Sequence, residues 1–181
     1  MTVPNQLTLL RLALTPVAAL LAASPDTAGR AWALGVFLVA MATDAVDGLV
    51  AKLPGQSSRL GLYLDPVVDK VILLTMFFVL AHLGLVPLWM ALLMMAREFV
   101  VDGLRSAAAT SAGRVVGANW MGKTKALLQT VCIALGLALG ALDVEPATAR
   151  AWVTGLTGAT LALAWAFAAV FVWQNRSLLR G

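Results

Sequence analysis

Charged residues are scarce in this sequence. Only 12% of its 181 residues are Asp, Glu, Lys or Arg, whereas soluble domains carry about 25%. Apolar residues make up 61% of the chain, and the mean hydropathy is +0.89. A chain with so little charge cannot cover a water-facing surface, which excludes an ordinary soluble domain and a disordered chain. The composition predicts an integral membrane protein.

Cysteine and histidine are almost missing, and the basic residues are not concentrated. The lone Cys132 excludes an intrachain disulfide, and the lone His82 is far in sequence from the acidic residues considered below. The isoelectric point is 9.8, but the 13 Lys and Arg residues are spread over six apolar stretches. Nucleic-acid binding needs a basic patch on a solvated face, so we predict no nucleic-acid partner.

Six apolar runs are long enough to cross a bilayer. A span needs about 20 mainly apolar residues, and the runs cover about residues 7–23, 31–51, 66–83, 86–108, 121–142 and 151–173. Short connectors with turn-forming residues separate them. A β-barrel is excluded because barrels show alternating segments of about ten residues. We predict an all-α integral membrane protein with six transmembrane helices, folded as one domain over residues 1–181.

Basic residues divide unevenly between the two predicted sides of the membrane. The opposite side holds only Arg30 and Arg150. The side with both termini collects ten, namely Arg11, Lys52, Arg59, Lys70, Arg105, Arg114, Lys123, Lys125, Arg176 and Arg180. Because basic residues are retained on the cytoplasmic side, we expect both termini to be cytoplasmic.

Four of the nine acidic residues fall at the facing ends of the second and third runs. Asp44 and Asp47 are three residues apart, and Asp65 and Asp69 are four apart, so each pair lies on one helix face. Clustered carboxylates repel one another unless cations neutralise them, and carboxylate oxygens suit Mg²⁺ or Mn²⁺ with a substrate phosphate as a further ligand. The spacing predicts a metal site. The alternative is that these carboxylates cap helices or pair with nearby basic residues.

The residues around the aspartates complete a longer pattern. From Asp44 to Asp69 the chain resembles the signature of the CDP-alcohol phosphatidyltransferase family, D-x2-D-G-x2-A-R-x8-G-x3-D-x3-D. Seven of the eight fixed residues match over 26 positions, and Lys52 replaces the family's Arg. The substitution keeps the charge but loses the planar guanidinium fork, which puts one diphosphate contact in doubt.

The resemblance implies roles for these positions. Asp44, Asp47, Asp65 and Asp69 would form the metal site, with two ions expected, and Asp69 would also act as the catalytic base. Gly48, Ala51, Lys52 and Gly61 would line the pocket for the CDP group of CDP-diacylglycerol. The opening Pro4-Asn5-Gln6-Leu7-Thr8-Leu9-Leu10-Arg11 is similar to that of bacterial phosphatidylglycerophosphate synthases within the family. Asn5, Thr8 and Arg11 would orient the nucleotide or diphosphate, although Asn5 can equally cap the helix start.

Later basic residues predict a phosphate pocket. Lys123 and Lys125 follow Gly122 at the start of the fifth run, where free backbone N–H groups favour an anion. Arg105 and Arg114 lie just before that run. The stretches Arg97-Glu98-Phe99 and Gly122 to Gln129 also resemble those of the same synthases. We assign Arg105, Arg114, Lys123 and Lys125 to the acceptor phosphate, the alternative being the ordinary basic bias of the cytoplasmic side.

Two polar residues lie deep in the fourth run. Arg97 and Glu98 are adjacent and do not share a helix face, whereas Glu98, Asp102 and Arg105 do. A structural pairing network and a substrate contact both remain open for them.

The resemblance implies an enzyme of phospholipid synthesis in the cell (inner) membrane. It would transfer the phosphatidyl group of CDP-diacylglycerol to glycerol-3-phosphate, giving phosphatidylglycerol phosphate and CMP, and act as a homodimer in the lipid bilayer. Inositol phosphate, serine or phosphatidylglycerol are alternative acceptors. A cation transporter also places carboxylates in membrane helices, but near the midplane.

Overall fold

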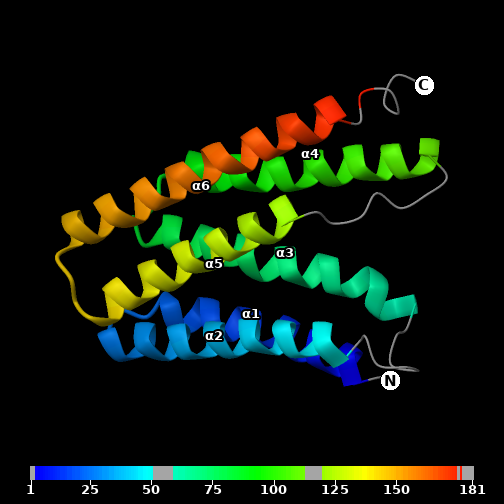
Figure 1. Ribbon diagram of the computed structural model, residues 1–181. Helices are drawn as coiled ribbons and strands as arrows, with labels where there is room; N and C mark the ends of the chain where they lie inside the picture. Colours follow the sequence, from blue (N-terminus) through cyan, green and yellow to red (C-terminus); the bar gives the residue numbers. More distant parts are fainter. Residues whose placement is uncertain (1–2, 51–58, 113–119, 175, 177–181) are drawn as a thin grey trace.

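The computed structural model describes residues 3–50, 59–112, 120–174 and 176, which form six helices and no strand (Figure 1). The helices are α1 (Val3–Ala22), α2 (Thr27–Val50), α3 (Arg59–His82), α4 (Leu88–Ala112), α5 (Trp120–Ala141) and α6 (Pro146–Gln174). The all-α prediction is confirmed. Several helices extend past the predicted apolar runs. The largest difference is in α3, which begins at Arg59 and includes Pro66, where the predicted run began.

Three helices are long and apolar enough to cross a membrane. They are α1 from Pro4, α5 and α6. The other three, α2, α3 and α4, are 24 to 25 residues long, and all the acidic residues of the candidate site lie within them. Six helices therefore match the six predicted runs, and for three of them the length and composition also meet the requirement for a span.

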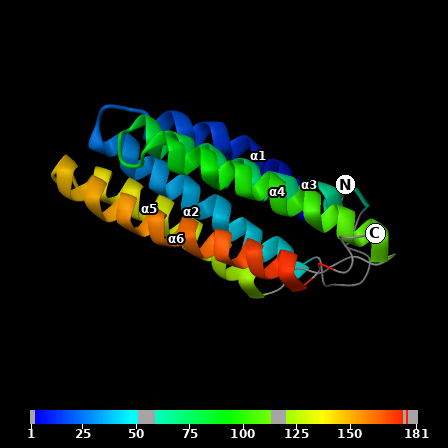
Figure 2. The ribbon, with the colours of Figure 1, turned by 90° about the horizontal axis from the view of Figure 1, so that it is seen from above.

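All six helices run along one long axis (Figures 1 and 2). α1, α3 and α5 begin at the same end of the bundle at which α2, α4 and α6 finish. We call this the aspartate end, because Asp44, Asp65 and Asp69 lie toward it. α1 packs against α2 and α3, α5 packs against α2, α3 and α6, and the helix neighbours of α4 are α3 and α6.

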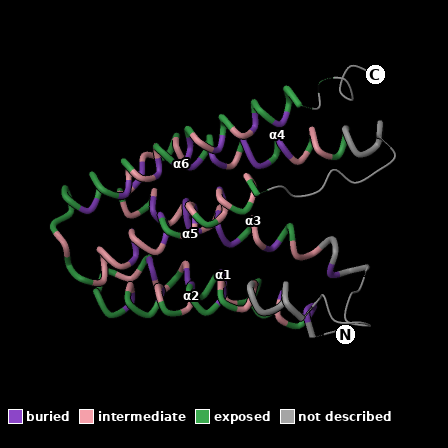
Figure 3. The backbone as a smooth tube through the Cα atoms, viewed as in Figure 1, coloured by how far each residue is buried: buried purple, intermediate pink, exposed green. Residues whose placement is uncertain are grey.

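Buried residues line the inner helix faces, and exposed ones face outward (Figure 3). The core includes Phe37, Met76, Phe77, Leu80 and Ile133, all fully buried. Large apolar side chains also cover the outer faces, among them Leu20, Trp32, Val39, Trp89, Leu127, Trp152 and Trp173. An outer surface this rich in apolar side chains is typical of a protein surrounded by lipid.

Two glycines let helices approach closely. A Cβ on Gly136 of α5 would lie 2.6 Å from Leu80 Cδ2, and a Cβ on Gly140 would lie 2.9 Å from Arg30 Cδ. The Gly136-x-x-x-Gly140 step thus packs α5 against α3 and α2 within the chain.

The end opposite the aspartates is closed by two similar turns. Gly84 and Asp143 have positive φ values of 72° and 51°. The next residue in each case donates back to the preceding helix, Leu85 N to Leu80 O and Val144 N to Leu139 O, both at 3.0 Å. This pattern ends a helix by satisfying its last carbonyl groups, and it turns α3 into α4 and α5 into α6.

Candidate active site

Three of the four predicted aspartates come together around α1. Arg11 Nη1 lies 2.8 Å from Asp44 Oδ1 on α2 and also pairs with Asp69 Oδ1 on α3. One turn earlier on α1, the Thr8 hydroxyl donates a hydrogen bond to Asp65 Oδ1. Three carboxylates from two helices therefore gather around one cation and one hydroxyl of a third helix.

Burial separates the cation from its acidic partners. The Arg11 side chain is fully buried, whereas those of Asp44 and Asp69 are 37% and 41% exposed. A buried guanidinium needs a counter-ion, and the two carboxylates provide it while keeping part of their surface open. The described carboxylates outnumber the guanidinium by three to one, so this cluster, which we call the Arg11 cluster, retains a negative surplus.

Part of the predicted aspartate site lies outside the described residues. The side chain of Asp47, together with Ala51 and Lys52, belongs to this part, whereas Gly48 is a residue of α2. Within the described ranges, no three carboxylate, His or Cys side chains form a complete metal site. Gly61 and Asn5 are buried in α3 and α1.

A cavity of about 330 Å³ opens beside Asp44 and Asp69. Its wall is built from α2 to α6, and Phe167 and Phe171 of α6 give it an apolar side. The remaining polar lining comes from three helices and carries both signs of charge, comprising Lys70, Arg97, Glu98, Asp102, Arg105, Lys123, Lys125 and Gln129. The cavity thus joins the aspartates to the predicted phosphate pocket.

The predicted acceptor residues that are described all line this cavity. Lys123 is exposed, Arg105 is half-buried and Lys125 is buried. The Arg105 guanidinium lies 6.0 Å from the centre of the Phe171 ring, within reach of a cation–π interaction, and its Nε has no hydrogen-bond partner among the described residues. Arg114 lies outside the described residues.

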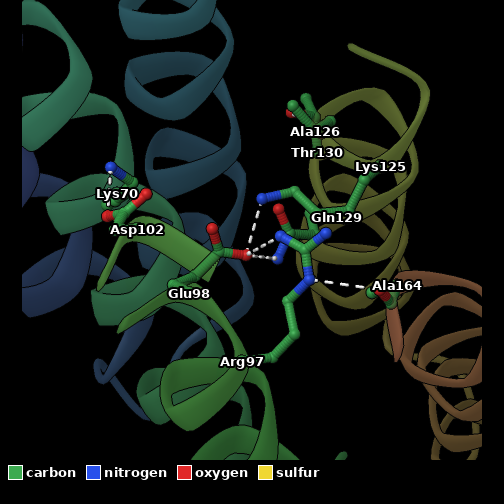
Figure 4. Close-up of polar contacts among 9 residues, drawn as sticks. All are labelled: Lys70, Arg97, Glu98, Asp102, Lys125, Ala126, Gln129, Thr130 and Ala164. Carbon is green, nitrogen blue, oxygen red and sulfur yellow. Dashed lines mark hydrogen bonds and ion pairs between the residues drawn. The ribbon is translucent and has the colours of Figure 1, made fainter. Parts of the chain in front are cut away.

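A second polar cluster is buried between α4, α5 and α6 (Figure 4). Glu98 Oε1 accepts from Lys125 Nζ at 2.6 Å and from Gln129 Nε2 at 3.5 Å. Arg97 Nη1 lies 3.5 Å from the same oxygen, and Arg97 Nε donates to the Ala164 carbonyl oxygen of α6 at 3.1 Å. We call these four side chains the Glu98 cluster.

The sequence pattern did not give the partners within this cluster. Arg97 and Glu98 are adjacent and were not expected to meet, but the long Arg97 side chain reaches the Glu98 carboxylate. Asp102, which shares a helix face with Glu98, instead pairs with Lys70 of α3 at 2.6 Å. Arg11, which is predicted to orient the nucleotide or diphosphate, pairs with Asp44 and Asp69. A charged residue inside an apolar run indicates that an oppositely charged side chain is buried beside it, but not which one.

Comparison with known proteins agrees with the signature. A family model described as CDP-alcohol phosphatidyltransferase matches residues 1–173. The chain is 34% identical over 143 residues to the CDP-diacylglycerol–glycerol-3-phosphate 3-phosphatidyltransferase of Bacillus subtilis (strain 168), covering 72% of this chain and 73% of the relative. It is 37% identical over 137 residues to the protein of the same name from Escherichia coli (strain K12), covering 73% and 74%.

A third relative carries a different name. The putative cardiolipin synthase of Mycobacterium tuberculosis (strain ATCC 25618 / H37Rv) is 37% identical over 103 residues, which is 57% of this chain and 48% of the relative. The two longer matches therefore share one enzyme name, and the shorter match has another.

Proposed function

Because the chain belongs to the CDP-alcohol phosphatidyltransferase family, we propose that it transfers the phosphatidyl group of CDP-diacylglycerol to glycerol-3-phosphate. The products are phosphatidylglycerol phosphate and CMP, and the reaction belongs to phospholipid biosynthesis. The names of the Bacillus subtilis and Escherichia coli relatives support this reaction. The observation that carries it is the single cavity lined by Asp44 and Asp69 on one side and by Arg105, Lys123 and Lys125 on the other.

The aspartates fit a divalent metal ion, on which the family generally depends. Their oxygens are the hard donors that Mg²⁺ and Mn²⁺ prefer, and those of Asp44 and Asp69 converge on one positive charge, Arg11 Nη1. We assign two ions to Asp44, Asp47, Asp65 and Asp69. When bound, such ions neutralise the diphosphate and stabilise the charge that develops on the departing phosphate.

The nucleotide occupies the α1–α3 side of the site. Asn5, Thr8, Gly48, Ala51, Lys52 and Gly61 line the pocket for the CDP group. Thr8 supports this arrangement because its hydroxyl lies against Asp65 and orients that carboxylate. Lys52 contributes a point charge to the diphosphate in place of a bidentate guanidinium.

Asp69 acts as the catalytic base. Its carboxylate is partly exposed at the cavity that also contains the basic residues. It removes the proton from the 1-hydroxyl of glycerol-3-phosphate, whose oxygen attacks the β-phosphorus of CDP-diacylglycerol. The bond from that phosphorus to the bridging oxygen breaks, and CMP leaves. Holding both substrates in one cavity supplies much of the rate enhancement.

The acceptor phosphate binds to Arg105, Arg114, Lys123 and Lys125. Three of these side chains line the cavity, and Nε of the half-buried Arg105 has no hydrogen-bond partner in the part of the chain that the structure describes. A phosphate monoester accepts several charge-assisted hydrogen bonds, which are stronger than neutral ones. Serine carries no phosphate for these cations to bind, so the basic lining of the cavity favours a phosphorylated acceptor.

The setting of the enzyme is part of the same proposal. The apolar helices and the bacterial relatives indicate a membrane-embedded protein. We place it in the inner membrane as a single domain and a homodimer, with both termini and the aspartate end on the cytoplasmic side. The excess of basic residues on that side supports this orientation.

The decisive experiment offers competing acceptors to the purified protein. In detergent micelles with CDP-diacylglycerol and Mg²⁺, CMP release should be fastest with glycerol-3-phosphate. A preference for inositol phosphate, serine or phosphatidylglycerol would reject the acceptor and keep the family chemistry. Cation flux through liposomes, without CMP release from any acceptor, would favour the transporter instead.

A further inference from the structure

Glu98 is the one carboxylate of the Glu98 cluster, and it has no place in the reaction described above. Its side chain is only 6% exposed. Three donors converge on its Oε1 atom: Lys125 Nζ at 2.6 Å, Gln129 Nε2 at 3.5 Å and Arg97 Nη1 at 3.5 Å (Figure 4). A buried carboxylate is costly unless it is paired and hydrogen-bonded, and this one is satisfied by residues of the cavity wall.

The contact from Glu98 to Lys125 bridges the cavity between two helices. The main helix neighbours of α4 are α3 and α6, whereas α5 packs against α2, α3 and α6. Glu98 of α4 and Lys125 of α5 both line the cavity. The ion pair therefore ties the wall formed by α4 to the wall formed by α5, at the residue assigned to the acceptor phosphate.

Glu98 itself is held in place from the other side. Arg97, its neighbour on α4, donates through Nε to the Ala164 carbonyl oxygen of α6 and approaches Glu98 through Nη1. Gln129 lies one turn after Lys125 on α5 and also donates to Glu98. These contacts link the carboxylate of α4 to α5 and, through Arg97, to α6. The Lys125 ammonium group, in contrast, is carried on a flexible four-carbon stem.

We propose that Glu98 is a positioning residue for the acceptor: it holds the Lys125 ammonium group at the cavity wall in the pose that binds the acceptor phosphate. This inference rests on the proposed function. A lysine ammonium has three N–H donors, and Glu98 Oε1 takes one of them. The others are available to a phosphate, which then binds without the entropic cost of ordering the lysine.

The charges in the cluster agree with this role. Arg97 and Lys125 bring two positive charges and Glu98 brings one negative charge. One positive charge is left over, so Glu98 orients the lysine without cancelling the attraction for an anion. If Glu98 served only to neutralise the basic side chains of the cavity wall, the positive and negative charges of the cluster would be equal in number.

The test is a double-mutant cycle on KM. Glu98→Gln should raise KM for glycerol-3-phosphate about tenfold, the usual effect of losing a hydrogen bond to a charged group, and change KM for CDP-diacylglycerol less than twofold. Lys125→Met should raise the same KM at least as much. In the Lys125→Met background, Glu98→Gln should add less than twofold, because its effect passes through Lys125.

The outcomes separate positioning from a structural role. An equal rise in KM from Glu98→Gln with and without Lys125 would overturn the proposal, as would an unchanged KM in the single variant. Glu98→Asp keeps the charge and withdraws the carboxylate by one methylene, so it should raise KM severalfold; a normal KM would show that position is irrelevant. The matched control is Glu145→Gln, the same chemical change at an exposed residue on the far end of the bundle, with KM unchanged.

Two further measurements keep the test valid. Thermal melting in detergent shows whether Glu98→Gln is folded. If it is poorly folded, KM is compared between the unmodified protein, Glu98→Asp and the double variant. The double variant leaves no unpaired charge in the Glu98–Lys125 pair. Failure of the proposed function is recognised separately, because the unmodified protein would then release no CMP with glycerol-3-phosphate. Normal activity of the unmodified protein with a normal KM for Glu98→Gln would reject this inference alone.

Discussion

The Arg11 cluster and the Glu98 cluster use the same chemistry with opposite signs. In the first, two partly exposed carboxylates, Asp44 and Asp69, pair with one fully buried guanidinium, and a third carboxylate, Asp65, accepts from the neighbouring Thr8 hydroxyl. In the second, two cations surround one carboxylate, and all three charged side chains are 10% exposed or less. Asp44 and Asp69 of the first cluster and all four side chains of the second line one cavity.

The difference shows how a membrane protein can hold two ligands of opposite charge side by side. A buried ion pair contributes little net stability, because desolvation offsets the attraction. Each cluster has an excess of charge of one sign. The excess is negative and accessible in the Arg11 cluster, and it is positive in the Glu98 cluster. The first surplus suits a metal ion and the second suits a phosphate, which are the two things that phosphatidyl transfer to a phosphorylated alcohol must bring together.

Removing the metal should have the largest effect and should separate the two clusters. With excess EDTA, CMP release should fall to background and return on addition of Mg²⁺, because the carboxylates then repel one another and the diphosphate is no longer held. Binding of glycerol-3-phosphate alone, followed by calorimetry, should be within about twofold of its original affinity. If EDTA abolished both CMP release and binding of glycerol-3-phosphate, the two clusters would not bind their ligands independently.

Asp69→Asn should remove the chemistry without removing the fold. The amide cannot accept the proton of the acceptor hydroxyl, so kcat should fall by about 10³-fold, within the usual range for loss of a general base. KM for glycerol-3-phosphate should change little, since Asp69 belongs to the Arg11 cluster. Near-normal turnover of the purified variant with both substrates and Mg²⁺ would exclude Asp69 as the base.

Arg11→Gln should show that the Arg11 cluster is short of positive charge. Without metal, the variant should lose about 3 kcal/mol of stability, because Asp44 and Asp69 lose their buried counter-ion. Mg²⁺ should restore part of this loss, since it neutralises the same carboxylates. In thermal melting the same addition should leave the deficit of Glu98→Gln unchanged. If Mg²⁺ did not restore any of the stability lost in Arg11→Gln, the metal ion would have to bind outside the Arg11 cluster.

Sequence patterns predicted the helices and the meeting of the aspartates better than they predicted individual partners. The apolar runs gave six helices, because length and hydropathy are local properties. Helix ends were less accurate: α3 begins at Arg59, since a helix can continue beyond the apolar stretch that reveals it. Spacing brought Asp65 and Asp69 onto one face, and the signature aligned them with Asp44.

Partners that depend on packing could not be read in the same way. Lys125 is 27 residues from Glu98, and nothing in either local pattern selects one for the other. Asp102 shares a helix face with Glu98, yet it pairs with Lys70 of α3 at 2.6 Å. The chain's charges could be sorted by side of the membrane, but their pairing was decided by which helices became neighbours.

Substitution of Glu145 should have the smallest effect on stability of the variants considered. Unlike the charged residues of the two clusters, Glu145 is exposed and its partner is a surface hydroxyl rather than a buried cation. Its Oε2 accepts from the Thr148 hydroxyl at 2.6 Å and from the Thr148 backbone N–H at 3.0 Å, at the start of α6. The side-chain hydrogen bond from Thr148 is the main reason that the pKa of Glu145 is lowered from its usual value. Its stabilising effect is therefore complete above the unfolded-state pKa, about 4.3, and is lost as pH falls through the lower folded-state pKa.

The melting temperature of Glu145→Gln in detergent should accordingly lie slightly below that of the unmodified protein from pH 8 down to about pH 5. As the pH falls through the lowered folded-state pKa of Glu145 the two should converge, since the carboxyl becomes neutral like the amide. The gap at pH 7 should be smaller than that caused by Arg11→Gln, because water screens an exposed charge and leaves a buried one dependent on its partners. A gap that persists undiminished to pH 3 would mean that Glu145 acts through packing, and one larger than that of Arg11→Gln would reverse the order in which buried and exposed charges matter here.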